Sequence, residues 1–333
     1  MARDQTSGLS GGERGGGLIL DRETYRKLTV RRDGLAATLL LLRIAFHAAL
    51  LAGANLLFAQ GQTVAALLLL IPHFVTWSFL GWAGVGHELF HRSVFSVRWL
   101  NTALFRLFSI LTWSNYGYFE VTHPIHHRNT LGEGDFEADP QGRLSPLGTL
   151  ALLTIDLGAL YRRVRVLALN AAGVAPGGAM AAIFPPGSDA FLKLRNGARA
   201  VLVGQALLIA TCLWLGSPFL AAAITLAPFC MTFVNRTLAA LQHFDLRASG
   251  VPGDYESSTR TVILGPVAGF FYADMNYHIE HHHFPSIPHY NLRKAHAAVT
   301  ARRRPLHLER GYWRGLRLLA RKGFFTSGRP LGA

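Results

Sequence analysis

Eight of the 15 histidines of this chain lie in three short clusters. The clusters read HELFH, HPIHH and HIEHH, and their histidines are His87 and His91, then His123, His126 and His127, then His278, His281 and His282. Residues three or four apart share one face of a helix, so each cluster can direct two or three imidazoles at one point. Eight nitrogens exceed the three or four protein ligands of a zinc site, and they suit two ions of a redox metal.

A largely apolar chain must position these clusters. Half of its residues are hydrophobic and 16% are charged, which is typical of a membrane protein. A spanning helix needs about 20 apolar residues, and four stretches meet this length, at residues 35–58, 64–86, 198–216 and 218–238. Uncharged turns join them in pairs. The sequence therefore predicts an all-α integral membrane protein with four transmembrane helices in two hairpins and a cytosolic helical cap that holds the histidines.

The basic residues indicate the orientation of this protein in the membrane. Lys and Arg residues precede the first predicted span, lie in the central loop at Arg162, Arg163 and Arg165, and recur at residues 302–304. Such residues stay on the cytoplasmic side, so both termini and all three clusters are expected there. The net charge of +14 is explained by this topology and by anionic lipid. A second role for this positive charge is to dock an acidic electron-carrier protein. Nucleic-acid binding is not expected, because no nucleic-acid recognition motif accompanies the charge.

The two ends of the chain differ from its middle. Residues 1–33 are polar and glycine-rich, and they predict a disordered cytosolic tail rather than a signal peptide. Residues 34–300 form the predicted membrane domain, and residues 301–333 form a basic C-terminal tail. The two cysteines, Cys212 and Cys230, lie within predicted spans, which excludes a disulfide framework and cysteine-bound iron.

The first cluster also has a rival interpretation. HExxH on a helix is typical of zinc metalloproteases, with Glu88 as the general base. A membrane metalloprotease would leave six clustered histidines without a role, so Glu88 is instead expected to orient a ligand imidazole or to be solvated. A histidine-rich metal transporter is a further alternative, but its ligands would be expected inside the spans.

The three boxes HELFH, HPIHH and HIEHHHFP, arranged around two hydrophobic hairpins, resemble the membrane fatty acid desaturase and hydroxylase family over residues 35–300. The resemblance implies a non-haem diiron centre on the cytosolic side and a further ligand at His243, in LAALQHFDL. The nine implied ligands are His87, His91, His123, His126, His127, His243, His278, His281 and His282. In some members an asparagine four residues before that last histidine contacts iron through water. Ala239 stands there in this chain, so this contact is not expected.

The resemblance further implies an O₂-dependent desaturase that introduces a double bond into a fatty acyl chain, carried by an acyl lipid or an acyl thioester. A hydroxylase or ketolase acting on fatty acyl, sphingoid or carotenoid chains remains the alternative. The implied cofactors are two iron ions, with O₂ as co-substrate. The sequence contains no HPGG, rubredoxin-type or GxGxxG motif, so a separate ferredoxin or cytochrome b5-type carrier is the expected electron donor, in addition to the lipid membrane and a long apolar-chain substrate.

Other polar residues could support the metal ligands. The candidate carboxylates are Glu120, Asp135, Glu137, Asp139, Asp274 and Glu280, of which Glu280 and Asp274 are favoured because they lie within or near the third box. Pro124 predicts that the helix of the second box begins near His123. His289 and His296 are expected at the surface. His47 and His73 lie within predicted spans, where they either form a functional site or hydrogen bond across helices.

Overall fold

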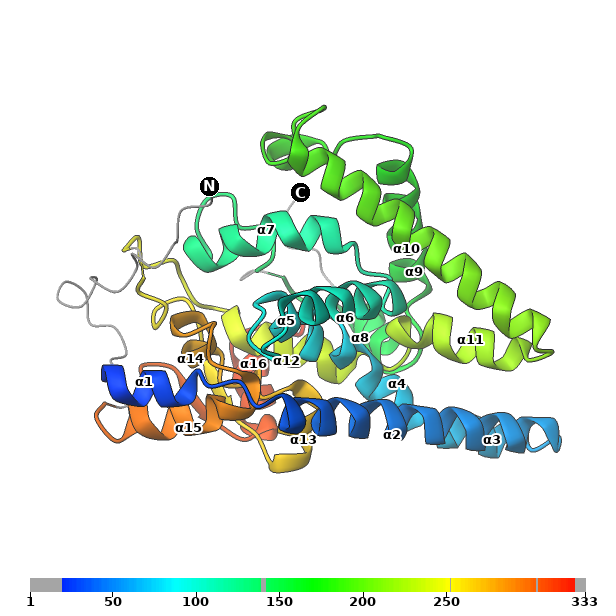
Figure 1. The fold of residues 1–333 in the computed structure, drawn as a ribbon, viewed down its shortest axis with the longest axis horizontal. Helices are drawn as coiled ribbons and strands as arrows, with labels where there is room; N and C mark the ends of the chain where they lie inside the picture. The colour runs from blue at the N-terminus through cyan, green and yellow to red at the C-terminus, as the bar shows by residue number, and fades with distance from the viewer. Residues whose placement is uncertain (1–19, 139–141, 252, 304, 327–333) are drawn as a thin grey trace.

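The computed structural model describes residues 20–138, 142–251, 253–303 and 305–326, and its regular secondary structure is almost entirely helical (Figure 1). Within these ranges, three helical segments are long and apolar enough to cross a membrane. They are α2 (Asp33–Ala59), the segment Thr63–Phe90 and α10 (Asp189–Trp214). The second consists of α3 (Thr63–Leu69), α4 (Ile71–Trp77), η1 (Ser78–Leu80) and α5 (Val85–Phe90). These segments correspond to the first three predicted spans.

The fourth predicted span, residues 218–238, is not one continuous helix. The apolar segment contains α11 (Pro218–Leu226) and η3 (Ala227–Phe229) and stops at Phe229. Pro228 has no backbone N–H to continue the helix, and Met231 adopts a left-handed φ of 51°. A separate helix, α12 (Phe233–His243), follows. Three of the four predicted spans thus coincide with helical segments long and apolar enough to cross a membrane, and hydropathy alone misses the break in the fourth because the residues around it are apolar.

Polar side chains connect the apolar helices. His47 Nδ1 lies 3.1 Å from His73 Nδ1, and His73 Nε2 lies 3.3 Å from the carbonyl oxygen of Ala223. These contacts join α2, α4 and α11. Of the two interpretations of His47 and His73, the hydrogen-bonded pair across helices is the one that the structure shows.

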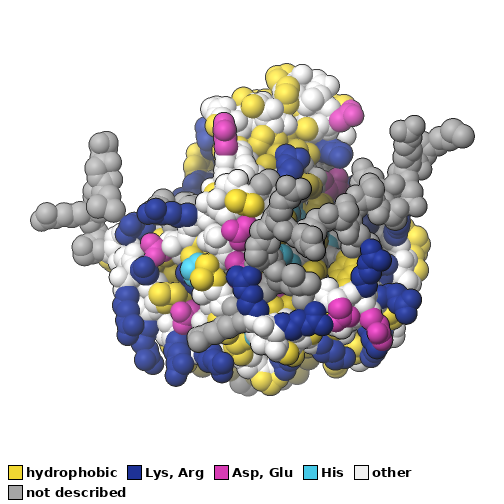
Figure 2. Space-filling model, turned by 90° about the vertical axis from the view of Figure 1, so that its left-hand side faces the viewer, with side chains coloured by type: hydrophobic (Ala, Val, Ile, Leu, Met, Phe, Trp, Pro, Cys, Tyr) yellow, Lys and Arg dark blue, Asp and Glu magenta, His cyan; other side chains and the backbone are white. Residues whose placement is uncertain are grey.

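The remaining helices together are called the cap; those after residue 265 lie toward the left and centre of Figure 1, whereas the segment 157–171 lies on the right beside α10. Its first half contains α6 (Arg98–Leu111), α7 (Tyr116–Arg128), α8 (Pro146–Leu153), α9 (Leu157–Ala171) and η2 (Gly178–Ala182). Its second half contains α12, α13 (Pro266–Tyr272), α14 (His278–His283), α15 (His289–Thr300) and α16 (Tyr312–Arg321). Buried aromatic residues, among them Phe105, Phe108 and Phe119, form the core next to α5. Figure 2 views the molecule from the left-hand side of Figure 1, where Lys and Arg side chains gather along the lower part of the face.

The N-terminal segment is partly ordered, which corrects the prediction of a disordered tail over residues 1–33. Residues 22–28 form α1 (Arg22–Leu28), whose N-terminus is capped by Asp21 Oδ1, 2.7 Å from Thr24 N. Asn291 Nδ2 donates to the carbonyl oxygen of Leu28 at 2.8 Å and docks this helix onto α15. Residues 1–19 lie outside the described residues.

The C-terminal segment is also part of the folded domain rather than only a basic tail. Strand β2 (Leu308–Arg310) pairs in parallel with β1 (Thr261–Ile263). Helix α16 is amphipathic: Leu319 is fully buried, and Gly315 lies so close to Leu241 that a β-carbon there would be 2.6 Å from Leu241 Cδ1. The prediction of a tail from residue 301 followed the arginines of α16 and overlooked its apolar face.

Candidate metal centre

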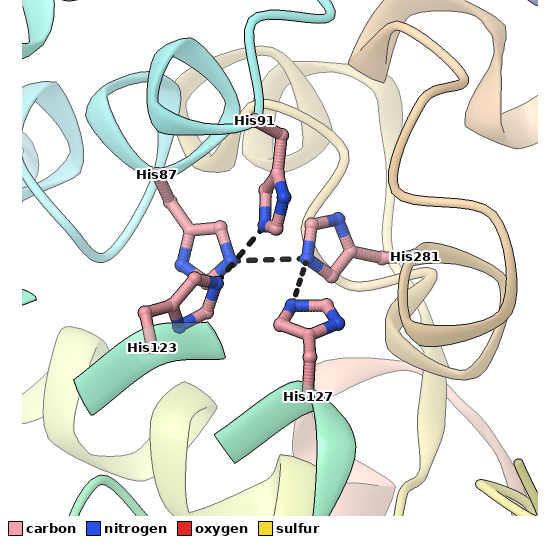
Figure 3. Close-up of side chains that lie close together, drawn as sticks. All are labelled: His87, His91, His123, His127 and His281. Carbon is pink, nitrogen blue, oxygen red and sulfur yellow. Dashed lines mark hydrogen bonds between the residues drawn. The ribbon is translucent and has the colours of Figure 1, made fainter. Parts of the chain in front are cut away.

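Nine histidines form two groups in the cap. His87, His91, His123, His127 and His281 form the five-histidine group, and His126, His243, His278 and His282 form the four-histidine group. Within each group one ligand nitrogen from every histidine lies within 4.8 Å of the others. Figure 3 shows the five imidazoles of the first group turned toward one another. The structure thus brings together every histidine that the sequence singled out as a candidate ligand.

Two short helices contribute to both groups. In α7, His123 and His127 are four residues apart and face the five-histidine group, whereas His126 faces the other group. In α14, His278 and His282 are four residues apart and face the four-histidine group, whereas His281 turns to the five-histidine group. His87 of α5 and His91, the residue that follows its last turn, both belong to the five-histidine group. The two groups therefore share α7 and α14 as common walls.

Helix α7 begins earlier than predicted. Asn115 is its N-cap, and Asn115 Oδ1 accepts from the backbone N of Gly117 at 3.1 Å. Pro124 consequently lies inside the helix and not in its first turn. Because α7 begins after Asn115, His123 lies in its third turn. There the His123 ring packs against the Phe119 ring, and the ring centroids are 4.3 Å apart.

The Nε2 atoms converge at the separation expected for ligands of one ion. His87 Nε2 lies 3.0 Å from His281 Nε2, and in the other group His243 Nε2 lies 2.9 Å from His278 Nε2. Two imidazole nitrogens bound at a right angle, each about 2.1 Å from a metal ion, lie about 3.0 Å apart. The observed spacing therefore fits metal coordination.

The outward nitrogens determine which atoms carry protons. His87 Nδ1 lies 3.1 Å from the Trp82 carbonyl oxygen, and His243 Nδ1 lies 2.9 Å from the Ser258 carbonyl oxygen. A carbonyl oxygen only accepts, so these Nδ1 atoms donate and a neutral ring keeps a lone pair on Nε2. Each of these two rings therefore directs an Nε2 lone pair into its own group, where it is available to a metal ion. The donor set thus fits a bound metal at each group.

Three carboxylates hold further imidazoles. His123 Nδ1 lies 2.8 Å from Glu137 Oε2, and His126 Nδ1 lies 2.9 Å from Asp135 Oδ2. In addition, Glu88 Oε1 lies 2.8 Å from His281 Nδ1, although the ring N–H does not point directly at the oxygen. Carboxylates in this position fix the orientation of a ligand ring and strengthen its donor nitrogen. Glu88 is fully buried and faces a histidine, which does not match the general base of a protease.

The prediction that Glu280 and Asp274 support the ligand histidines is wrong. Glu280 Oε1 lies 2.5 Å from His296 Nδ1, and Asp274 Oδ1 lies 3.8 Å from Arg293 Nη2, so neither contacts a histidine of the two groups. Two positions after His278, Glu280 lies about 200° around the helix and so points away from the metal site. The sequence could have shown this.

Of the other candidate carboxylates, some contact histidines of the two groups and others do not. Glu120 pairs with Arg106 at 3.0 Å, and Asp139 lies outside the described residues. Asp135 and Glu137 reach α7 through the loop after Arg128, which no helical spacing predicts.

The predicted positions of His289 and His296, which lie outside the two groups, are wrong. His289 is buried, with 2% of its surface exposed, because α15 packs its first turn inward. His296 contacts Glu280 and is mostly buried. Both were expected at the surface. His283 also lies outside both groups.

Burial keeps the ligand nitrogens in the form that binds metal. It lowers the pKa of His91, His123, His127, His278 and His282 well below the usual histidine value, so these rings are neutral. His126 differs: burial lowers its pKa, but Glu137 and Asp135 more than offset this effect and raise it. Burial opposes ionisation of Asp135, yet the hydrogen bond from His126 and two backbone N–H groups hold the pKa of Asp135 at about 2.

A cavity lined by both polar and apolar side chains adjoins both groups. It has a volume of ≈ 220 Å³, and histidines of both groups line it, among them His87 and His243. Trp82, Phe119 and Met275 supply apolar surface beside them. Ala239 is also in this wall, and its methyl group offers no polar atom to a metal-bound water. A hydrocarbon chain in this cavity would lie against the imidazoles.

Comparison with known protein families agrees with this site. The chain matches the family model described as fatty acid desaturase over residues 62–313, which is about three quarters of its length. The chain belongs to the fatty acid desaturase family, and membership implies an integral membrane oxidoreductase. The match extends beyond the predicted membrane domain and includes β2 and the start of α16. No curated protein matches the sequence.

Proposed function

We propose that this protein is an O₂-dependent diiron desaturase that introduces a double bond into a fatty acyl chain. The arrangement of nine imidazoles in groups of five and four, with inward Nε2 atoms and outward Nδ1 partners, is the observation that carries this proposal. The five-histidine and four-histidine groups each bind one iron ion. Membership of the fatty acid desaturase family supports the reaction class.

The donor set suits iron better than zinc or magnesium. All nine proposed ligands are imidazoles, which bind iron well, whereas magnesium prefers oxygen donors and a structural zinc site takes four ligands. When bound, two irons with O₂ supply the oxidising power to remove hydrogen from an unactivated C–H bond. The carboxylates act from outside the ligand shell: Glu137 holds His123 and Asp135 holds His126.

The chain itself positions the substrate. Trp82, Phe119 and Met275 form an apolar wall beside His87, where a methylene segment is held and water is excluded. Positioning one carbon beside the metal site determines which bond is oxidised, because the reactive distance is only a few ångströms. No side chain is required as a nucleophile.

The proposal includes an external electron donor and a cytoplasmic active site. Positive charge along the cap in Figure 2 supports a cytoplasmic cap and attraction of an acidic ferredoxin or cytochrome b5-type carrier. Both termini are proposed to lie on the same side as the cap.

Metal analysis and product analysis test the proposed function. The purified protein should contain two irons per chain and, with an electron donor, consume O₂ and remove two hydrogens from an acyl chain. His126→Ala should lose iron and activity. His283→Gln, which changes a histidine outside both groups in the same cap, should retain both. One zinc per chain with peptide hydrolysis would overturn the proposal, and gain of an oxygen atom in the product would identify a hydroxylase instead.

A further inference from the structure

A second hollow lies beside Trp82. Tyr118 of α7 and Val166 and Leu167 of α9 give this groove an apolar floor, Arg162 and Arg163 also line it, and its volume is ≈ 330 Å³. Trp82 lines the groove as well, and it therefore borders both an open amphipathic groove and the cavity beside the histidines.

Trp82 is held firmly in this position. Its Nε1 donates to Ser109 Oγ at 3.1 Å, and its ring packs against Phe119 with centroids 4.6 Å apart. Its carbonyl oxygen is the acceptor for His87 Nδ1. The residue that borders both hollows is thus also connected to a proposed iron ligand.

The groove carries positive charge with little internal compensation. Arg163 Nη1 donates to the carbonyl oxygen of Trp113 at 3.2 Å, and in the described part of the chain no carboxylate lies within ion-pair distance of it. The Nη2 atom of Arg162 lies 3.9 Å from Asp156 Oδ1, and the Arg162 side chain is 70% exposed. Both arginines line the groove, and a guanidinium group with several N–H donors suits a phosphate, which it can bind in a bidentate manner.

Helix α9, which lines the groove, packs against α10. Leu167 of α9 packs with Ala198 and Val201 of α10, and Arg199 Nε donates to the carbonyl oxygen of Ala171 at 2.9 Å. The part of α10 before this contact contains its charged residues, and the part after it, residues 200–214, contains none. The groove therefore lies on a helix that packs against one of the apolar span candidates.

We propose that this groove binds a phosphate-bearing acyl lipid of the membrane, with the phosphate on Arg162 and Arg163 and one acyl chain passing Trp82 into the cavity beside the histidines. This inference rests on the proposed desaturase function and specifies its substrate class as a phospholipid rather than a soluble thioester. Trp82 is a specificity-determining residue, because its position sets which carbon reaches the imidazoles.

Binding to the purified protein in detergent tests the groove without turnover. The probes are dioleoyl phosphatidylglycerol, dioleoylglycerol, which lacks the phosphate, and oleoyl coenzyme A, and mass spectrometry of the intact complexes measures the bound fraction. Phosphatidylglycerol should bind most tightly. The double variant Arg162→Gln/Arg163→Gln should weaken its binding about tenfold and leave dioleoylglycerol unchanged.

A matched control is available on the same helix. Arg165→Gln removes one positive charge from α9, but Arg165 does not line the groove, so phosphatidylglycerol binding should stay within about twofold of wild type. Equal loss in the control and the double variant, or tighter binding of the thioester or the neutral lipid, would overturn the proposal. Iron content, measured in the same samples, separates this result from failure of the desaturase proposal.

Variants of Trp82 test the connection between the hollows. Trp82→Ala should join them and shift the position of the double bond along the acyl chain, with iron content unchanged because the carbonyl that holds His87 remains. Trp82→Phe keeps a smaller aromatic ring, so it should shift the double bond less than Trp82→Ala does. This variant provides the test if the alanine variant does not fold. An unshifted double bond in both variants would show that Trp82 does not set the position.

Discussion

Asp135→Asn separates the two proposed metal sites. In the wild type, Oδ2 accepts from His126 Nδ1 at 2.9 Å and from Leu131 N at 2.8 Å, while Oδ1 accepts from Glu137 N at 2.9 Å. Asparagine has the same shape, but one of its two positions is an NH₂ group that can only donate. Whichever way the amide turns, a donor meets a donor.

The size of the effect follows from this mismatch. If the NH₂ group faces His126, the ring must carry its proton on Nε2 and loses the lone pair that binds metal. If it faces Glu137 N, a charge-assisted hydrogen bond that holds the loop is lost. A hydrogen bond to a charged group contributes about 1.5–3 kcal/mol, and loss of such outer partners weakens metal binding about 10- to 100-fold. The two estimates agree.

Iron content after dialysis against a chelator of known affinity is the assay. Asp135→Asn should release the iron of the four-histidine group and retain that of the five-histidine group, leaving about one iron per chain and no desaturation. Asp21→Asn is the matched control, because Asp21 caps α1 far from the histidines and asparagine caps a helix equally well. Unchanged iron affinity in Asp135→Asn, or equal loss from both groups, would refute the reasoning.

Three further predictions address the other group and the fold. Glu88→Gln removes the buried charge beside His281, and it should weaken iron binding in the five-histidine group about 10- to 100-fold in the same dialysis assay. Gly117→Ala places a β-carbon against the carbonyl of Lys193 in α10, and thermal unfolding in detergent should show destabilisation of about 1–3 kcal/mol. Leu319→Ala creates a cavity beneath α16 and should destabilise the protein by about 2–5 kcal/mol in the same measurement.

Each of these variants has a control of the same chemistry. Glu23→Gln changes an exposed carboxylate that pairs with Lys27, and iron loss equal to that of Glu88→Gln would contradict the role of Glu88. Gly34→Ala adds a methyl group with no atom within 4 Å. Leu306→Ala shortens a side chain that is 63% exposed. Unfolding temperatures equal to those of these controls would contradict the predicted packing of α7 and α16.

The predictable part of the site rests on local spacing. His278 and His282 are one helical turn apart, so their shared face follows from the helix itself. The same rule places His281 on a different face, which allows one short helix to contribute to both histidine groups. His243 came only from the family resemblance, since a lone histidine at the end of an apolar segment has no cluster to identify it.

Contacts between segments that are distant in the sequence could not be predicted from helical spacing. Asp135 and Glu137 meet His126 and His123 because the loop after α7 folds back on the helix. The interruption after Phe229 and the packing of α16 on α12 also depend on contacts that hydropathy does not register.

The sequence by itself determined the family, the histidines and three of the four apolar spans, because cluster spacing and hydrophobic length are local properties. Only the tertiary structure decided how the histidines divide into five and four, which carboxylates hold them, and that Trp82 borders two hollows. The physical reason is that a side chain's partner is set by the packing of elements far apart in the chain. No periodicity within one element contains that information.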